Sequence, residues 1–275
     1  MNTVKELSRK WYKIIGFPEE FDEKFEKLLC EETDIAPMKF AEYDVAANSQ
    51  NKGKNLIMFL YFCEELLSKY EEKGIPREIF DATVKDFILS VKRQYNLTGD
   101  IGIVRAYILE RHLSMKLFKL GRLQFCMDGI CMDVPEAGLK KGDNIIDIHI
   151  PPGEPLKMGE CVKSFEAAEE FFGKFFPDFE YRYYSCHSWL LADNLKMFLK
   201  EDSNILRFQK LFRVVHTGEN NGILNFMFKY GIEDREELRQ IEAATAFAKK
   251  VKDHALSGGK FYASLGIRDR HNKEF

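Results

Sequence analysis

The segment from Asn144 to Val215 constrains the fold of this chain more than any other part of the sequence. It reads as a strand ending in Pro151-Pro152-Gly153, an amphipathic helix, a second strand, a short helix and a third strand. The first strand cannot continue its ladder through the prolines, because proline has no N–H. Two strands joined by a crossover helix form a parallel pair whose C-terminal ends lie beside one another. The segment therefore predicts a sheet edge at which polar residues meet.

The predicted crossover helix is the clearest element of this segment. Apolar residues recur at the spacing of one buried helix face, at Val162, Phe165, Ala168, Phe172 and Phe175. Pro177 marks the end of the helix. The chain has 24 phenylalanines, so we expect an aromatic-rich core.

The N-terminal part of the chain follows a different pattern, with apolar residues at helical spacing throughout. The predicted helices cover residues 4–16, 19–32, 55–74, 76–96 and 103–114. Gly74 follows the third helix and Pro76 opens the fourth, both at positions that these residues favour. The pattern predicts an α+β protein with a helical domain over residues 1–113 and a second domain, containing a sheet, over residues 114–275.

After Lys119 the pattern changes to short apolar runs separated by turn residues. Asp128-Gly129 suits the positive φ angles of a tight turn and predicts a hairpin between the runs on either side. Together with the strand near Ile145, these runs predict an antiparallel meander before the crossover helix.

The C-terminal part predicts a polar loop after Val215 and a long helix from about Asp234 to His254. A final apolar run over residues 260–267 predicts a strand that returns to the sheet beside residues 211–215. The segment between these two strands would then pack on a face of the sheet.

Composition and charge exclude several classes of function. The net charge is −3 and no block of lysine and arginine occurs, which argues against nucleic acid or an anionic membrane as partner. No apolar run reaches the length of a membrane span, and the N-terminus lacks the apolar run of a signal peptide. The six cysteines are scattered without a CxxC pair and predict reduced thiols. We therefore expect a cytoplasmic protein.

The sequence also resembles a known family. The order hairpin, strand, crossover helix, strand, short helix, strand resembles the core of the GNAT N-acetyltransferase fold. Four stretches resemble a bacterial family in particular: DIGIVRAYILERHLSMKLFKLGRLQF, IHIPPGEPL, CHSWLL and DSNILRFQKLF. Members of that family carry a helical N-acyltransferase-like N-terminal domain, followed by a GNAT-like domain with a mixed β-sheet flanked by helices. The likeness covers nearly the whole chain.

The resemblance implies an acyltransferase that uses acyl-CoA or acetyl-CoA as co-substrate. Enzymes of this fold hold coenzyme A where two neighbouring strands splay apart, and these strands resemble residues 144–150 and 181–189. The acyl carbonyl would bond to the backbone near Ile148 and Ile150. The pyrophosphate would lie at the N-terminus of the following helix, where free N–H groups attract anions. The implied binding residues of that loop are Leu156, Met158, Gly159 and Glu160.

The loop differs from the usual phosphate-binding pattern of that fold, which is Gln or Arg, two residues, Gly, one residue, then Gly or Ala. This chain has LKMGECVKS, in which Gly159 is the only glycine, and Glu160 would repel a pyrophosphate. Two hypotheses follow. In the first hypothesis, the protein is an N-acyltransferase that transfers an acyl group from acyl-CoA to a small-molecule or peptide amine by direct attack. Alternatively, it is a non-catalytic GNAT-like binding module that has lost ordinary coenzyme A binding.

His149, Cys186 and His187 are the candidate catalytic residues. The imidazole of His149 suits the removal of a proton from an attacking amine, although a structural histidine beside the strand end is the alternative. Cys186 could act as a thiolate nucleophile, or be a buried and inert thiol. Because adjacent strand residues point to opposite faces, Cys186 would need His149 rather than His187 as its partner. A zinc site built from the three lacks a fourth ligand, so we predict no metal.

Overall fold

Helices occupy the described chain up to Leu113, and the first strand begins at Leu117. The computed structural model describes residues 3–32, 35–103, 105–228 and 235–272. The chain divides into two compact units, residues 1–120 and residues 121–275. The helices of the first part and the mixed sheet that follows confirm the predicted α+β class. The predicted domain division after residue 113 stays a prediction, for which a test is given in the Discussion.

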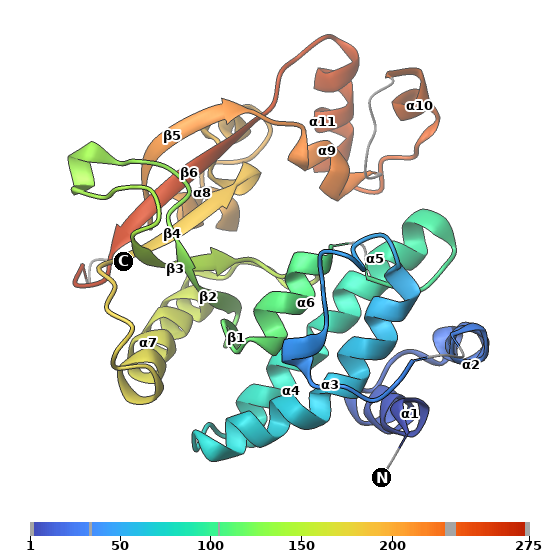
Figure 1. The fold of residues 1–275 in the computed structure, drawn as a ribbon. Coiled ribbons are helices and arrows are strands. Elements are labelled where there is room, and N and C mark those ends of the chain that lie inside the picture. The colour runs from blue at the N-terminus through green and yellow to red at the C-terminus, as the bar shows by residue number, and fades with distance from the viewer. Residues whose placement is uncertain (1–2, 33–34, 104, 229–234, 273–275) are drawn as a thin grey trace. The chain divides into compact units, whose positions relative to one another are not determined.

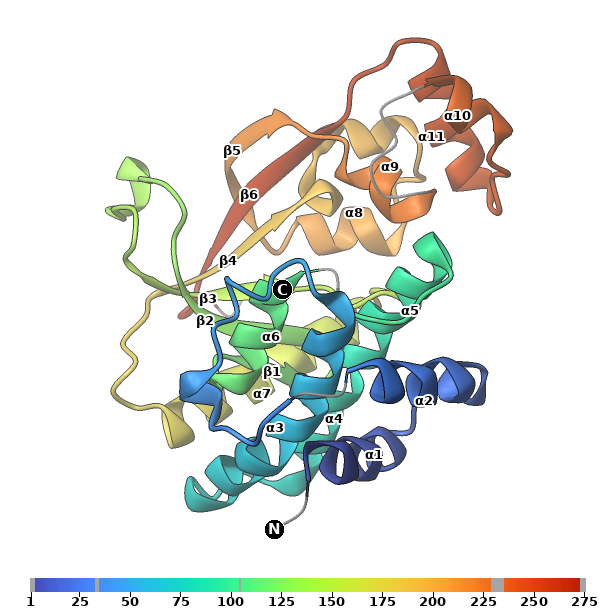
Figure 2. The ribbon, with the colours of Figure 1, turned by 45° about the vertical axis from the view of Figure 1, so that its right-hand side comes forward.

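The first unit is built around α3, its longest helix. In chain order it contains α1 (Val4–Ile15), the 3₁₀ helix η1 (Glu19–Phe21), α2 (Asp22–Glu31), η2 (Phe40–Glu42), α3 (Lys52–Glu72), α4 (Arg77–Lys85), α5 (Phe87–Thr98), α6 (Ala106–Leu113) and strand β1 (Leu117–Leu120). Thr3 and Glu6 form a capping box that starts α1, and Gly16 ends it at a φ of 79°. Helices α1, α4 and α6 contact α3 (Figures 1 and 2). Within the described ranges, no helix combines the length and apolar character needed to cross a membrane.

One predicted helix is divided in two. The spacing over residues 76–96 predicts a single helix, but α4 and α5 are separated by Asp86. The ψ angle of Asp86 is −18°, and its carbonyl accepts from the amide of Leu89 in a tighter, 3₁₀-type turn. The Asp86 carboxylate pairs with Lys119 Nζ at 3.1 Å. The apolar pattern could not predict this break, because the apolar residues on both sides of Asp86 keep helical spacing.

Six strands form one mixed sheet in the order β1-β2-β3-β4-β6-β5. After β1 the strands are β2 (Leu123–Gly129), β3 (Asn144–His149), β4 (Tyr183–Ser188), β5 (Arg213–Glu219) and β6 (Tyr262–Asp269). Strands β3 and β4 are parallel and are joined by α7 (Met158–Phe175), as the sequence predicts. The pairs β2–β3, β4–β6 and β5–β6 are antiparallel. The predicted return of the final strand is confirmed, because β6 pairs with β5 (Figure 1).

The predicted hairpin at Asp128-Gly129 is wrong. These residues end β2, where Gly129 pairs with Asn144 of β3. The turn lies earlier, at Gly121, whose φ of 68° favours glycine. Gly129 serves close packing instead, since a Cβ there would lie 3.0 Å from the carbonyl oxygen of Gly142. A glycine needed for the close approach of two backbones gives the same sequence signal as a glycine needed for a turn.

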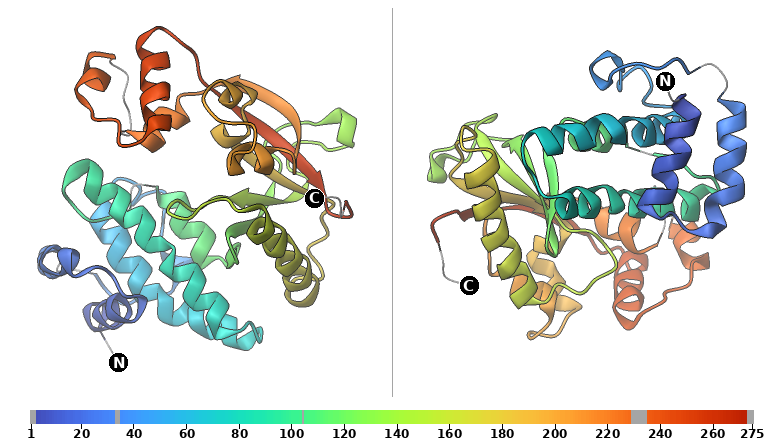
Figure 3. Two further views of the ribbon diagram at one scale, coloured as in Figure 1. Left: turned by 180° about the vertical axis from the view of Figure 1, so that it is seen from behind. Right: turned by 90° about the horizontal axis from the view of Figure 1, so that it is seen from below.

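Both faces of the sheet are covered near the start of β3. On one face, Phe165 of α7 packs edge-on against Tyr184 of β4 and Phe125 of β2, with ring centroids 5.1 and 5.8 Å apart. Figure 3 shows α7 lying along this face. The connection from β2 to β3 contains the 3₁₀ helix η3 (Pro135–Ala137) and contributes to a second apolar cluster. The members of that cluster are Ile130, Val134, Leu139, Ile145, Tyr183, Leu265 and Ile267.

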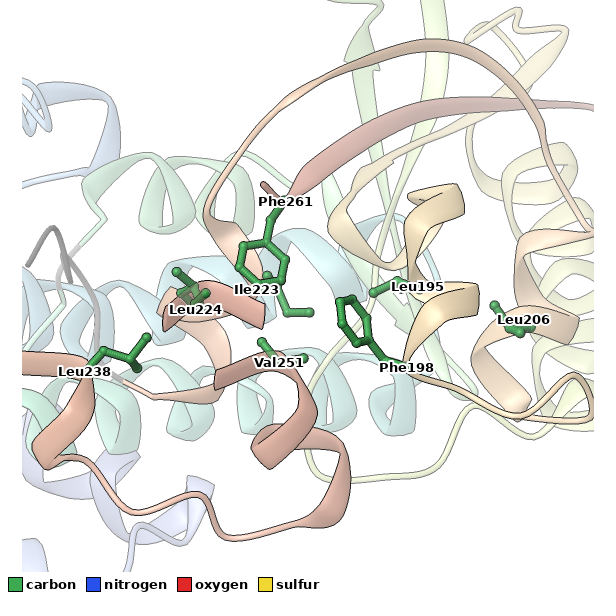
Figure 4. Close-up of a cluster of buried hydrophobic side chains, with 9 residues drawn as sticks. Leu195, Phe198, Leu206, Ile223, Leu224, Leu238, Val251 and Phe261 are labelled. Carbon is green, nitrogen blue, oxygen red and sulfur yellow. The ribbon is translucent and has the colours of Figure 1, made fainter. Parts of the chain in front are cut away.

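A third apolar cluster joins the helices of the C-terminal part. These helices are η4 (Trp189–Leu191), η5 (Asp193–Met197), α8 (Asn204–Gln209), α9 (Gly222–Met227), α10 (Arg235–Gln240) and α11 (Ala246–Leu256). Figure 4 shows Phe198, Ile223, Val251 and Phe261 within this cluster. None of its buried members lies in a described strand, so the insertion does not pack on a sheet face as predicted.

The predicted long helix in this region is also wrong. Its expected start, Asp234, lies outside the described residues, and the remainder forms α10 and α11 rather than one helix. Thr245 begins α11, because its hydroxyl accepts from the amide of Ala248.

Strand β5 is longer than its apolar residues predict. The sequence predicts a loop after Val215, but the strand continues to Glu219 past a bulge between Val214 and His216. The side chains of Thr217 and Ser264 are hydrogen-bonded across β5 and β6 at 2.8 Å. Polar residues suit β5 because it lies at the edge of the sheet and is largely exposed.

Candidate functional site

The parallel strands β3 and β4 part before either of them ends. Their ladder stops at the pair Asp147–Ser185, although both strands are fully described beyond it. Strand β3 continues to His149 and β4 continues to Ser188. On its other side β4 remains paired with β6 as far as Ser188. The carboxyl ends of the parallel pair therefore diverge, at the kind of position where ligands bind in sheets with crossover helices.

Three polar side chains converge on one face of the sheet at this point. Ser185 Oγ donates to Asp147 Oδ1 at 2.7 Å, and Asp147 Oδ2 lies 3.3 Å from His149 Nε2. Ser185 is buried, whereas the side chains of Asp147 and His149 are 20% and 35% exposed. The carboxylate is thus held from inside the sheet while the imidazole reaches the surface. A carboxylate at this distance can orient the imidazole ring.

The structure does not bring Cys186 to His149. Since Ser185 faces Asp147, its neighbour Cys186 points to the opposite face of the sheet, which α7 covers. The Cys186 thiol is 1% exposed, and burial raises its pKa well above the ordinary value, with a further contribution from the Asp147 carboxylate. His187 alternates back to the face of His149 and is exposed. Two of the three candidate catalytic residues therefore share a face, and the third does not.

The N-terminus of α7, which follows β3 in the chain, is open to solvent. Lys157 precedes the helix without a side-chain cap, and its carbonyl accepts from the amide of Glu160. The amides of Met158 and Gly159 find no backbone acceptor within the described residues. A Cβ built on Gly159 would meet nothing within 4 Å. Such a helix end can accept an anion.

The negative charge of Glu160 is partly offset at this helix end. Its carboxylate lies 3.2 Å from Lys163 Nζ, and both side chains are exposed. The repulsion that the sequence predicts between Glu160 and a pyrophosphate is therefore reduced by a neighbouring cation and by solvent screening.

Arg122, in the turn before β2, holds the loop that leads into α7. Its Nη2 donates to the carbonyl of Glu154 at 2.5 Å, and its Nε donates to that of Pro155 at 3.2 Å. Its backbone amide donates to Ser164 Oγ at 2.8 Å, and that hydroxyl donates to the Glu160 carbonyl at 2.8 Å. Arg122 is 6% exposed and Ser164 is fully buried. One turn of the sheet thus fixes both the loop and the start of the helix.

The other predicted cofactor-binding residues lie along the path from β3 to α7. The side chains of Ile148 and Leu156 are buried, and Ile148 pairs with Phe125 of β2. Ile150 follows the last residue of β3 and is half-buried, as is Met158. Side chains packed in this way leave the backbone of the segment as the part that can contact a ligand. Their role in binding stays a prediction.

Asp147, Ser185 and Arg122 were not predicted as site residues. Asp147 had a usable signal, because it lies two positions before His149 in a strand and so shares its face. Ser185 and Arg122 had none. Their contacts depend on the register of β3 against β4 and on the position of the turn at Gly121, neither of which the local sequence specifies.

A hollow of about 410 Å³ lies elsewhere, within the first unit, between α1, α3 and the segment at Met38. Its lining includes two carboxylates that already have partners. Glu64 accepts from Lys10 and from the Trp11 indole, and Glu65 accepts from Lys69. We do not assign this hollow to the candidate site, because its two carboxylates are held by these partners and its lining includes none of the predicted site residues. In the described residues no group of three or more His, Cys, Asp and Glu side chains is placed to hold a metal.

The fold is similar to that of solved acyltransferases. A crystal structure of an acyltransferase in complex with decanoyl-CoA and teicoplanin matches with a TM-score of 0.73 and 21% identity, over 98% of this chain and 89% of that chain. An acyltransferase in complex with decanoyl-CoA matches with a TM-score of 0.74 and 21% identity, over 95% of this chain and 87% of that chain. At this level of identity the likeness establishes the fold.

Sequence comparisons give the family. A protein of Roseiflexus sp. (strain RS-1), named a nucleotide-binding protein, is 26% identical over 106 residues, which are 36% of this chain and 64% of that protein. The chain therefore spans less than two thirds of that relative. The N-acyltransferase N-terminal domain model matches residues 2–115, and the GNAT-like C-terminal domain model matches residues 117–268. The second match covers more than half of the chain, which therefore belongs to the family of proteins with the GNAT-like C-terminal domain.

Proposed function

We propose that the protein is an N-acyltransferase that moves an acyl group from acyl-CoA to an amine by direct attack. The observation that carries this proposal is the divergence of β3 and β4 beyond the Asp147–Ser185 pair, with His149 beside it. The open N-terminus of α7 supports it, because an anion of the donor can bind there. Membership of the family and the likeness to acyltransferases crystallised with acyl-CoA support the same donor.

The proposed reaction needs no covalent enzyme intermediate. The amine nitrogen attacks the thioester carbonyl, the new C–N bond forms, the C–S bond breaks, and the coenzyme A thiolate leaves. Backbone amides near Ile148 and Ile150 would stabilise the charge that develops on the carbonyl oxygen. His149 would take the proton that the amine loses. The proton can then pass to solvent or to the departing thiolate.

We assign no nucleophilic role to Cys186. A thiol must ionise to attack a thioester, and burial holds the pKa of this thiol well above the usual range. His187 is retained as a residue of the acceptor side, because it is exposed on the same face as His149.

The proposed acceptor is a small-molecule amine. A solved relative of similar fold was crystallised with both decanoyl-CoA and teicoplanin, which supports a small-molecule acceptor for this chain as well. The net charge of −3 gives no support to a nucleic-acid partner.

Binding of the donor is the first test. Acetyl-CoA, octanoyl-CoA and decanoyl-CoA are titrated into the protein by calorimetry, with the thermal midpoint as a second readout. A donor that binds only the folded protein must raise that midpoint. If none of the three binds at millimolar concentration, the binding-module hypothesis replaces the enzyme.

The His149→Ala variant tests the chemical step. Turnover, followed as release of free coenzyme A with a panel of primary amines, should fall by ~10²–10⁴-fold, the usual contribution of a general base. The dissociation constant of the donor should not change, because His149 would contact the acceptor. His271→Ala, an exposed histidine after β6, is the matched control and should keep full turnover. Equal turnover in both variants would remove His149 from the mechanism.

A further inference from the structure

We propose that Asp147 is a positioning residue for His149, and that Ser185 in turn holds Asp147. This inference rests on the proposed function, because it concerns how His149 is prepared to accept the amine proton. It adds Asp147 of β3 and Ser185 of β4 to the candidate site, for which the sequence predicts only two histidines and a cysteine as catalytic residues.

The geometry engages both carboxylate oxygens of Asp147. Oδ1 accepts from Ser185 Oγ at 2.7 Å, and Oδ2 lies 3.3 Å from His149 Nε2. Asp147 and Ser185 are also ladder partners, so the hydroxyl is fixed opposite the carboxylate by the backbone itself. His149 lies two positions further along the same strand, where the pleat directs it to the same face. Each contact therefore follows from strand register rather than from a flexible loop.

The contact with Asp147 selects the tautomer of His149. An ionised carboxylate can only accept hydrogen bonds, so the ring nitrogen that faces it, Nε2, carries the hydrogen. In the neutral imidazole the other nitrogen, Nδ1, is then the acceptor. Replacing Asp147 removes the carboxylate that sets this preference.

The charge balance of the site points the same way. No lysine or arginine pairs with Asp147 among the described residues, and its two partners are a neutral hydroxyl and an imidazole. The neighbours on this face are Cys126 opposite Asp147 and Gln124 opposite His149 on β2, with His187 on β4. Asp128 of β2 shares this face but lies opposite Ile145, four residues along β3 from His149, so Asp147 is the carboxylate placed beside the ring. It gains an opposite charge when His149 becomes protonated, which stabilises the state that forms during attack.

Nuclear magnetic resonance of the ring nitrogens tests the positioning directly and needs no acceptor. Protein labelled with ¹⁵N-histidine is titrated, and His149→Gln identifies the His149 signals. Asp147→Asn should lower the pH at which the His149 signals titrate, because an opposite charge beside the ring is removed. It should also abolish the preference for hydrogen on Nε2. Ser185→Ala should cause a smaller shift in the same direction.

Asp202→Asn, which removes an exposed carboxylate outside the site, is the matched control and should leave the His149 signals unchanged. If Asp147→Asn leaves both the tautomer and the titration of His149 as in the wild type, the proposal is overturned.

Kinetics separate this inference from the proposed function. With decanoyl-CoA as donor and benzylamine as acceptor probe, Asp147→Asn should lower kcat by ~10–10²-fold, less than loss of the base itself. The dissociation constant of decanoyl-CoA should stay the same. A variant with altered His149 signals but wild-type kcat would overturn the positioning role and leave the acyltransferase intact. Failure of the wild type to bind decanoyl-CoA would instead overturn the proposed function.

Discussion

At the scale of single residues, burial decides what the cysteines of this chain can do. All six lie in the described residues, and Cys63, Cys126, Cys161 and Cys186 are buried whereas Cys30 and Cys131 are exposed. Burial raises the pKa of the Cys161 thiol to about 11 and moves the pKa values of Cys63 and Cys186 well above their ordinary range. Thiolate chemistry is therefore expected at the two exposed cysteines rather than at Cys186.

Thiol labelling checks this directly. At pH 8 Ellman's reagent should react quickly with the two exposed thiols and slowly with the other four, because burial keeps the reagent away from them. In urea all six should react. Cys186→Ala should keep the turnover of the wild type, whereas His149→Ala should lose it. If a third thiol reacts quickly in the wild type but not in Cys186→Ala, Cys186 is again a candidate nucleophile.

The candidate site could be predicted in part at this scale. His149 and His187 could be placed at a strand end from the prolines and the alternation of IDIHI. The separation of Cys186 from His149 could not, because it depends on which residue of β4 pairs with Asp147. A shift of one residue would have put Cys186 on the face of His149.

At the scale of elements, the turn before β2 is hydrogen-bonded to the start of α7, although the two are far apart in the chain. Arg122 holds the loop carbonyls of Glu154 and Pro155, and Ser164 links the Arg122 amide to the first turn of α7. A Cβ at Gly121 would lie 2.7 Å from Ser164 Oγ, so the turn can approach the helix only as glycine. We call these contacts of Arg122 and Ser164 the brace. In the proposed function the brace would fix the loop before the donor binds, which would reduce the entropy lost on binding.

Removing the brace should weaken donor binding without affecting the chemical step. Arg122→Met should raise the dissociation constant of decanoyl-CoA by about tenfold, or 1.4 kcal/mol, and leave kcat unchanged. Decanoyl-pantetheine, which lacks the pyrophosphate, should bind Arg122→Met and wild type equally. Arg207→Met, at an exposed position on α8, is the control. If decanoyl-CoA and decanoyl-pantetheine lose affinity to the same extent, the brace stabilises the domain in general rather than the loop that leads into α7.

Elements that the local apolar pattern specifies could be predicted from the sequence. Elements whose position depends on tertiary contacts could not. The crossover helix and its two strands match the sequence because an amphipathic stripe and a proline stop specify them locally. The turn was misplaced because Gly121 and Gly129 give equal signals and only packing against Ser164 and Gly142 tells them apart. The polar end of β5 was missed because an edge strand needs no apolar residues.

At the scale of the whole molecule, the fold excludes fewer possible functions than the residues of the candidate site do. The match to the GNAT-like C-terminal domain and the similarity to solved acyltransferases specify a scaffold, and one scaffold supports many chemistries. The proposal of acyl transfer rests on the diverging strands, the polar side chains and the open helix end, which all lie between Asn144 and Ser188. The donor site is therefore expected to be complete within the C-terminal part of the chain.

Expression of the two parts as separate fragments tests this expectation together with the predicted domain division. Residues 114–275 retain β1 and every other strand of the sheet, so this fragment should fold, unfold cooperatively on heating and bind decanoyl-CoA. Residues 1–113 should be helical by circular dichroism and should not bind the donor. Arg122→Met in the 114–275 fragment should weaken binding as it does in the full chain. A 114–275 fragment that folds but binds no donor would show that residues 1–113 contribute to the donor site. A fragment that does not fold would place the division elsewhere.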